Sequence, residues 1–306
     1  MMKFAVAFTL CACVVMTTGL KLNERLFSAE HSVLQVAEML GATELIKLVE
    51  AAGLNGTLSG KGPFTLFAPT NVAFSHLDPW YLQYYGKNIT ALQEVLTHHV
   101  VSGSVMSSSL SNDKLIPSLQ GSKLRANIYM HGQTIATIDG AIVRSVDHKA
   151  ANGVVHVIEK VLNNPADHDV AWLLQNIPEF STLLTAVNAT NLLSTLAGPG
   201  PFTVFAPLDI AFTKLPPGVL DSLVKNPTAL KQLLLYHVVS GTYFSPGLPE
   251  GPLPTLAGKN VMIRMKPGQI EVEGVMVTEE SAVKNGVIYV IENVLFPPQM
   301  KFRLDF

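Results

Sequence analysis

The residues that could support catalysis or metal binding are nine histidines and two cysteines. His98 and His99 are adjacent in the sequence. On a helix, neighbouring side chains diverge by about 100°, so this pair is unsuited to holding one metal ion. The chain has no HExxH, GxSxG or Walker phosphate-loop motif, the patterns that place a metal, a nucleophile or a phosphate group. We therefore expect no enzyme, no metal site and no cofactor.

The N-terminal segment has the layout of a secretory signal peptide. Lys3 supplies a positive start, residues 4–16 are apolar, and small residues follow at Thr17–Gly19. This order predicts a signal peptide over residues 1–19, followed by a polar leader over residues 20–31.

The same segment contains both cysteines, Cys11 and Cys13. The mature chain would therefore have no cysteine and would hold its fold by packing alone. No later apolar run reaches the length of a membrane span, and the charged tail at 299–306 lacks a lipid-anchor signal. We expect a secreted protein of the extracellular space or matrix.

Three sequons for N-linked glycosylation begin at Asn55, Asn88 and Asn188. Asn226 is excluded because Pro227 follows it. Asn55 lies in a glycine-rich stretch that predicts a loop, which makes it the best candidate. Asn188 falls in a predicted helix and would be less accessible. All three depend on a eukaryotic source.

The chain is a tandem duplication. The stretch Gly62–Phe74 returns as Gly200–Phe212, with nine of the thirteen positions identical. Two further blocks recur in the same order: His98–Gly103 as Tyr236–Gly241, and Asn152–Leu162 as Asn285–Leu295. A unit of roughly 130 residues is far longer than a solenoid repeat of about 20–50 residues. Each copy should therefore be a domain with its own core.

The recurring stretch predicts a strand, a sharp corner and a short helix. Residues 64–68 are almost continuously apolar between Gly-Pro and Pro69, a pattern typical of a buried strand. Thr70 in the first copy and Asp209 in the second are predicted helix N-caps. A repeated packing motif without chemistry is the simplest interpretation of this stretch.

Periodicity places the remaining elements. Ser32 and Gln35 predict a capping box at the start of a helix, and residues 123–129 and 134–138 predict a hairpin. A second helix should begin near residue 89, with one face turned to the core: Ile89, Leu92, Val95, Leu96 and His99.

Length and charge bound the organisation. The 306 residues suit two domains, which we place at 32–164 and 165–298. The formal net charge is −2 without a basic run or stripe, so we expect no nucleic-acid partner. The link near residues 163–169 is too short to let two domains move far apart.

At these blocks the chain resembles the fasciclin (FAS1) domain family. The strand-Pro block, the Tyr-His block and the final Asn-Gly-Val strand carry the resemblance, each of them twice. The resemblance implies an α+β fold of two tandem FAS1 domains, each a compact β-sandwich or wedge with helices packed around it. It also implies extracellular adhesion and matrix roles, often through integrins.

The resemblance links the Tyr-His block to integrin recognition. That block is Tyr236-His237 in the second copy and His98-His99 in the first, so only the second copy matches fully. Because the histidines fall on an apolar helical face, the alternative is a core histidine held by a hydrogen bond.

A second family motif, an acidic segment before the last strand, persists here only as its acid, Asp147 or Glu280. An exposed acid could bind an integrin, and a solvated loop charge is the alternative. Leu208-Asp209-Ile210 resembles a short integrin-binding tripeptide. It falls in the recurring core block, so we discount it.

Two functions remain after these comparisons of residues. The first is a secreted adhesion or matrix glycoprotein that binds cell-surface receptors such as integrins, or matrix proteins, with self-association as an option. The second is a soluble carrier whose apolar pocket holds a lipid or another small hydrophobic ligand.

Overall fold

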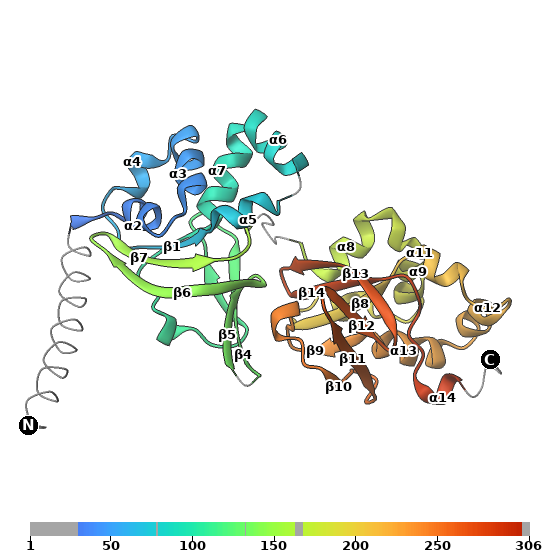
Figure 1. Cartoon of the computed structure of the whole chain (residues 1–306). Coiled ribbons are helices and arrows are strands. Elements are labelled where there is room, and N and C mark those ends of the chain that lie inside the picture. Colours follow the sequence, from blue (N-terminus) through green and yellow to red (C-terminus); the bar gives the residue numbers. More distant parts are fainter. Residues whose placement is uncertain (1–29, 78, 132, 163–167, 302–306) are drawn as a thin grey trace, which may run out of the picture. The chain divides into compact units, whose positions relative to one another are not determined.

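The computed structural model describes residues 30–77, 79–131, 133–162 and 168–301. The expected signal peptide, both cysteines, most of the expected leader and the last five residues lie outside this part of the chain. The chain divides into two compact units (Figure 1). One takes residues up to 110, 116–124 and 141–163, and the other takes 111–115, 125–140 and the chain from 164 onward.

The first repeat opens with helices on either side of its first strand. These elements are α2 (Val33–Met39), α3 (Thr43–Ala51), α4 (Asn55–Leu58), β1 (Phe64–Pro69), α5 (Asn71–Ser75), α6 (Pro79–Lys87) and α7 (Ile89–His98). The other strands follow with one short 3-10 helix: β2 (Val100–Ser102), η1 (Ser107–Ser109), β3 (Lys114–Pro117), β4 (Lys123–His131), β5 (Gln133–Ile138), β6 (Ala141–Ala150) and β7 (Gly153–Ile158).

The second repeat has the same order of elements, with two additions, η2 and α14. Its first half contains α8 (Val170–Asn176), η2 (Pro178–Phe180), α9 (Ser181–Ala189), α10 (Leu193–Leu196), β8 (Phe202–Pro207), α11 (Asp209–Thr213), α12 (Val219–Val224) and α13 (Pro227–Tyr236). Its second half contains β9 (Val238–Ser240), η3 (Ser245–Gly247), β10 (Gly251–Pro254), β11 (Asn260–Lys266), β12 (Gln269–Val272), β13 (Val275–Val283), β14 (Gly286–Ile291) and α14 (Pro298–Lys301).

Each repeat builds one seven-stranded sheet. The strand orders are β2-β1-β7-β6-β5-β4-β3 and β10-β11-β12-β13-β14-β8-β9. The edges of each sheet approach one another, because single bridges join Val101 to Ser118 and Val239 to Thr255. Each sheet is therefore nearly closed, with helices packed around it, and the α+β class is confirmed.

The recurring Gly-Pro strand lies inside each sheet, between the last strand of the repeat and a short edge strand. β1 runs parallel to β7, and β8 runs parallel to β14. Leu66 and Ala68 join the core beneath the helices, while Phe67 stacks on His156 on the other face. A strand buried on both faces needs a continuous apolar run, which is what the sequence provides.

The close pairing of β1 with β7 explains why the Asn-Gly-Val block has a glycine at residue 153. A Cβ on Gly153 would lie 1.9 Å from the backbone oxygen of Phe64. Any side chain at this position would force β1 and β7 apart. Gly286 has the same relation to Phe202 O in the second repeat, at 1.8 Å.

Capping follows the sequence in the first repeat and departs from it in the second. Ser32 and Gln35 form the expected capping box, and the Thr70 side chain caps α5 by accepting from Ala73 N–H. The expectation for Asp209 was wrong, because Asp209 is the first residue of α11 and Leu208 occupies the cap position. Asp209 instead accepts from Thr182 N–H at the start of α9.

Each repeat contains an apolar core between its helices and the central strands. One buried cluster draws only on residues between Val33 and Val155, and another draws only on residues between Val170 and Phe296. On α7 the expected core face is correct except at Ile89, which is 51% exposed at the first turn of the helix. Within the described residues, no helix has the length and apolar character needed to cross a bilayer.

Candidate functional site

The histidine of the Tyr-His block forms a latch between a helix end and the segment after the last strand. The Nδ1–H of His99 donates to Val95 O at 2.7 Å, and Leu162 N–H donates to His99 Nε2 at 2.9 Å. The second bond needs an unprotonated Nε2, so the ring is neutral. Burial lowers the pKa of His99 to about 3.

The second repeat reproduces the same latch. His237 Nδ1–H donates to Leu233 O at 2.8 Å, and Leu295 N–H donates to His237 Nε2 at 2.9 Å. Burial lowers the pKa of His237 to about 4. In both repeats the imidazole joins α7 or α13 to the segment that follows the final strand.

The residue before each latch histidine is also buried. Its side chain contacts the first residue of β11 in the second repeat and the residue before β4 in the first. The Tyr236 hydroxyl donates to Asn260 O at 3.0 Å, at the first residue of β11. His98 Nδ1 lies 2.7 Å from Ser122 Oγ, just before β4. All four side chains of the two blocks are at most 3% exposed. The structure therefore favours the core interpretation, and partner contact through these residues would require local unfolding.

Asp147 lies at an irregularity in the pairing of β6 and holds a loop in place. The register of β6 with β7 shifts between Ser145 and His148, and Asp147 adopts a φ of 63°. Its carboxylate accepts from Ser107 N–H at 2.8 Å and from Ser107 Oγ–H at 2.6 Å. Burial raises the pKa of Asp147, but the Ser107 hydrogen bonds outweigh this effect and the pKa lies below its usual value.

Glu280 occupies the equivalent place in the second repeat. Ser245 N–H donates to Glu280 Oε2 at 2.9 Å, as Ser107 N–H does to Asp147. Asp147 and Glu280 are both partly exposed. We name the two sites, Asp147 with Ser107 and Glu280 with Ser245, the acid turns.

A ring on the last strand fixes the same loop from beneath. His156 Nε2–H donates to Val105 O at 2.8 Å, and the Tyr289 hydroxyl donates to Tyr243 O at 2.8 Å. Thr65 and Thr203 add hydrogen bonds to Gly103 O and Gly241 O at 2.6 and 2.8 Å. The loop of each acid turn is thus hydrogen-bonded to β1 and β7 in the first repeat and to β8 and β14 in the second.

Ser107, Asp147 and His156 combine the residue types of a hydrolytic triad, but their geometry differs from one. The base of a triad must accept the proton of the nucleophile. Here the Ser107 hydroxyl donates to Asp147, and His156 Nδ1 accepts instead from Asp147 N–H at 3.2 Å. His156 is fully buried. The sequence alone did not reveal this cluster, because its three members lie on separate elements.

In the tripeptide Leu208-Asp209-Ile210, the aspartate also has a structural role. Besides its bond from Thr182 N–H, Asp209 accepts from Ser181 Oγ–H at 2.6 Å. Burial raises the pKa of Asp209, but its hydrogen bonds from Ser181 and Thr182 keep the pKa below the usual value. Its neighbour Ile210 is 51% exposed.

The three sequon asparagines lie at helix positions. Asn55 is the exposed first residue of α4, so the expected loop is a short helix. Asn188 is exposed near the end of α9, which is helical as expected. Asn88 is partly buried and is the N-cap of α7.

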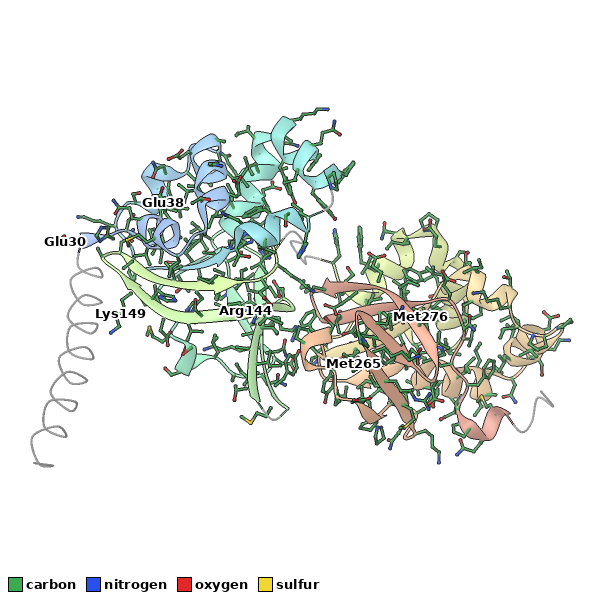
Figure 2. All side chains as sticks on the ribbon, in the orientation of Figure 1. Glu30, Glu38, Arg144, Lys149, Met265 and Met276 are labelled. Carbon is green, nitrogen blue, oxygen red and sulfur yellow. The ribbon has the colours of Figure 1, made fainter. Side chains whose placement is uncertain are left out.

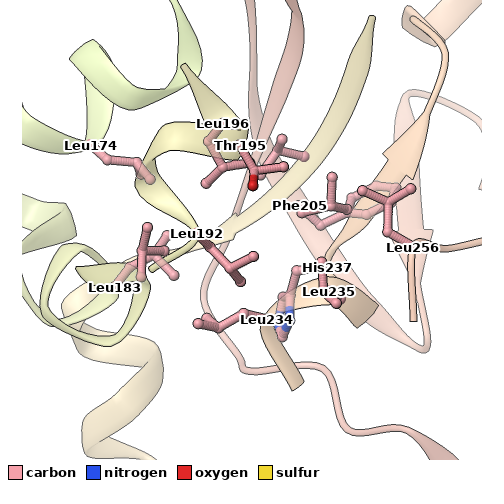
Figure 3. A pocket seen from close by; sticks show the side chains of 13 residues that line it. Leu174, Leu183, Leu192, Thr195, Leu196, Phe205, Leu234, Leu235, His237 and Leu256 are labelled. Carbon is pink, nitrogen blue, oxygen red and sulfur yellow. The ribbon is translucent and has the colours of Figure 1, made fainter. Parts of the chain in front are cut away.

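An apolar cavity lies within the helical side of the second repeat (Figure 3). Leu174, Leu183 and Leu234 border it, together with His237 (Figure 3). Its volume is about 20 Å³. A water molecule needs about 10–15 Å³ on this measure, and sites for drug-sized ligands are about 300–1,000 Å³. This cavity is too small for a lipid.

Metal binding finds no support in the described part of the chain, where no group of three or more acidic, histidine or cysteine side chains could hold an ion. The polar contacts described above are instead structural: buried rings and half-buried carboxylates hold backbone groups.

Comparison with known proteins identifies the class of protein. The model of the fasciclin domain matches residues 40–164 and 178–297. These two matches cover most of the chain and coincide with the two repeats. The chain belongs to the fasciclin domain family and contains two such domains in tandem.

Several relatives are longer than this chain. Human periostin is 30% identical over 304 residues, which is 98% of this chain and 36% of periostin. The transforming growth factor-beta-induced protein ig-h3 of Sus scrofa is 30% identical over 253 residues, 81% of this chain and 37% of that protein. The chain thus spans little more than a third of the length of these two relatives.

Single-domain similarity extends to bacteria. The immunogenic protein MPB70 of Mycobacterium bovis is 36% identical over 135 residues, 42% of this chain and 69% of that protein. Among solved structures, a FAS1 domain pair from the insect cell adhesion molecule fasciclin I matches with 20% identity and a TM-score of 0.39. That match covers 85% of this chain and 99% of the other.

Proposed function

We propose that the chain is an extracellular adhesion or matrix glycoprotein that acts by contact with other proteins rather than by catalysis. Its partners would be cell-surface receptors such as integrins, or matrix proteins, and self-association would add avidity. The observation that carries this proposal is the similarity to periostin and ig-h3 across both fasciclin domains.

The acid turns are the contact points that we propose within each domain. Val146, beside Asp147, is 40% exposed, and the charged side chains of Arg144 and Lys149 extend from the same strand (Figure 2). The Asp147 carboxylate is already held by Ser107 before a partner arrives. A group fixed in advance loses less conformational entropy on binding.

Attachment of cells to the immobilised full-length chain tests this proposal. Asp147→Ala combined with Glu280→Ala should reduce attachment severalfold, because both carboxylates are lost. Attachment of the unaltered chain no greater than that to an inert protein coat would contradict the proposed function itself.

Ser107→Ala is the matched control for the acid turn. It removes the hydroxyl that donates to Asp147 but leaves the carboxylate in place. If the carboxylate contacts the receptor, Ser107→Ala should attach cells nearly as well as the unaltered chain. Equal losses in both variants would mean that only the shape of the loop matters, and would refute direct contact by the acid.

The carrier remains a separate prediction, which would need an apolar cavity of ligand size among the described residues. Native mass spectrometry of the purified chain would reveal a bound lipid as an added mass. The small volume of the cavity beside His237 counts against that outcome.

A further inference from the structure

Two aromatic side chains of the first repeat, Trp80 and Tyr84, lie outside its buried core. Helix α6 buries none of its residues, and Trp80 and Tyr84 are 58% and 41% exposed. One turn apart, these two rings are stacked with centroids 5.1 Å apart and an interplanar angle of 5°. Exposed aromatic surface of this kind is typical of sites that bind something.

Asn88 continues the same line of side chains. Trp80, Tyr84 and Asn88 are spaced four residues apart, which places them on one helical face. Asn88 N–H donates to Tyr84 O at 3.0 Å, so the hydrogen bonding of α6 extends to Asn88. The side chain then points at the ring, because Asn88 Nδ2 donates to the Tyr84 hydroxyl at 3.3 Å.

The orientation of the Asn88 carboxamide is fixed at both ends. Its Oδ1 accepts from Ala91 N–H at 3.1 Å as the cap of α7. Nδ2 is therefore turned toward Tyr84. It is the atom to which an N-linked sugar would be bonded. Ile89 and Thr90 complete the sequon, and both are exposed.

We propose that Asn88 carries an N-linked glycan and that its first N-acetylglucosamine packs on the ring of Tyr84. In the transfer step, the bond between the sugar C1 and a lipid-linked pyrophosphate breaks and a bond between C1 and Nδ2 forms. The lipid pyrophosphate leaves, and one carboxamide proton is released. Nδ2 keeps its second hydrogen, which can still donate to the Tyr84 hydroxyl.

The chemistry of the two surfaces is complementary. One face of a pyranose ring presents C–H groups with partial positive charge, and the face of an aromatic ring is electron-rich. Trp80 already covers one side of Tyr84. The sugar would form the next layer of the stack and remove exposed aromatic surface from water.

The second repeat lacks both halves of this arrangement. The offset that relates Gly62 to Gly200 also relates Asn88 to Asn226, and Asn226 caps α13 through Ala229 N–H at 3.1 Å. Pro227 removes the acceptor signal there, and the residue one turn earlier is Ser222, which has no ring. The Asn cap is common to both repeats, whereas the sequon and the stacked rings of Trp80 and Tyr84 occur together only in the first repeat.

The first experiment measures occupancy. The full chain is produced in a eukaryotic secretory host, and peptides containing each sequon are analysed by mass spectrometry after enzymatic removal of glycans in H₂¹⁸O. Most Asn88 should carry the mass mark of deglycosylation. Predominantly unmodified Asn88 would overturn the inference, whatever the state of Asn55 and Asn188.

The second experiment tests the packing. The glycans are trimmed to a single N-acetylglucosamine, and hydroxyl-radical labelling of Tyr84 is compared with that in Thr90→Ala, which removes the sequon but keeps the cap. Labelling of Tyr84 should be about threefold lower in the glycosylated chain because the sugar covers its ring. Tyr81 on the same helix should be unchanged, and Thr90→Ser should retain the protection.

Equal labelling of Tyr84 with and without the sugar would overturn the packing part. Neither readout depends on cell attachment, so this inference and the proposed adhesion function can fail separately.

Discussion

At two matching positions the two repeats have different buried rings that form hydrogen bonds. Where the first repeat has His98 and His156, the second has Tyr236 and Tyr289. His156 and Tyr289 donate to equivalent backbone carbonyls, at Val105 and Tyr243. At these positions the fold needs a buried ring with a polar edge, and either residue type supplies it.

The latch histidine, by contrast, is the same residue in both repeats. His99 and His237 each use both ring nitrogens, one as donor and one as acceptor. A tyrosine offers a single hydroxyl and cannot reproduce this pair of contacts. The comparison teaches that identity is retained where both repeats form the two hydrogen bonds of the latch, and that the residue changes between His156 and Tyr289, where only the bond to the loop carbonyl is common to both repeats.

The largest expected effect comes from removing the latch. His99→Ala or His237→Ala should each lower the free energy of unfolding by about 3–5 kcal/mol, because each leaves a buried N–H without an acceptor and opens a cavity. The loss in free energy of unfolding is measured by urea unfolding, with hydrogen exchange followed separately in each repeat. The exposed His76→Ala should have little effect, and a mild loss in only one repeat would break the equivalence.

The next effect concerns pH. The pKa values of His99 and His156 in the first repeat and of His237 in the second lie below that of a free histidine. The unfolded chain therefore binds more protons below about pH 6.5, and stability falls as the pH drops from there toward 4. The first repeat has two such histidines among its described residues and the second has one, so the first should lose more stability as the pH falls to 4.5.

Hydrogen exchange of each repeat between pH 7 and 4 checks this difference. The first repeat should open at the higher pH. His156→Tyr, which copies the residue of the second repeat, should narrow the gap. Simultaneous opening of both repeats would show that the carboxylates, rather than the histidines, set the acid limit.

The smallest effect is expected from single hydroxyl groups. Tyr236→Phe should cost about 1 kcal/mol, because it removes the hydroxyl that donates to Asn260 O and leaves the ring in place. Tyr289→Phe should cost a similar amount through Tyr243 O. Tyr81→Phe on the surface serves as the control in urea unfolding. A loss from Tyr236→Phe as large as that from His237→Ala would contradict the difference between a one-bond and a two-bond ring.

Much of the fold could be predicted from local sequence patterns. The apolar run before Pro69, the capping box at Ser32 and the pairing of β4 with β5 depend on neighbours within a few positions, and the sequence predicts all three. Asp209 was misplaced because its partner, the start of α9, lies 27 residues away. The candidate site was harder still, since Asp147 and Ser107 are 40 residues apart.

The sequence by itself determined the duplication, the two domains and the family, because repeated blocks and buried strands leave a signature in residue order. Only the tertiary structure decided what the polar residues do. It buried the Tyr-His block against distant backbone groups, turned Asp147 onto Ser107, and set Asn88 against Tyr84. Such contacts depend on which atoms face each other after the sheet has nearly closed, and spacing along the chain does not encode that.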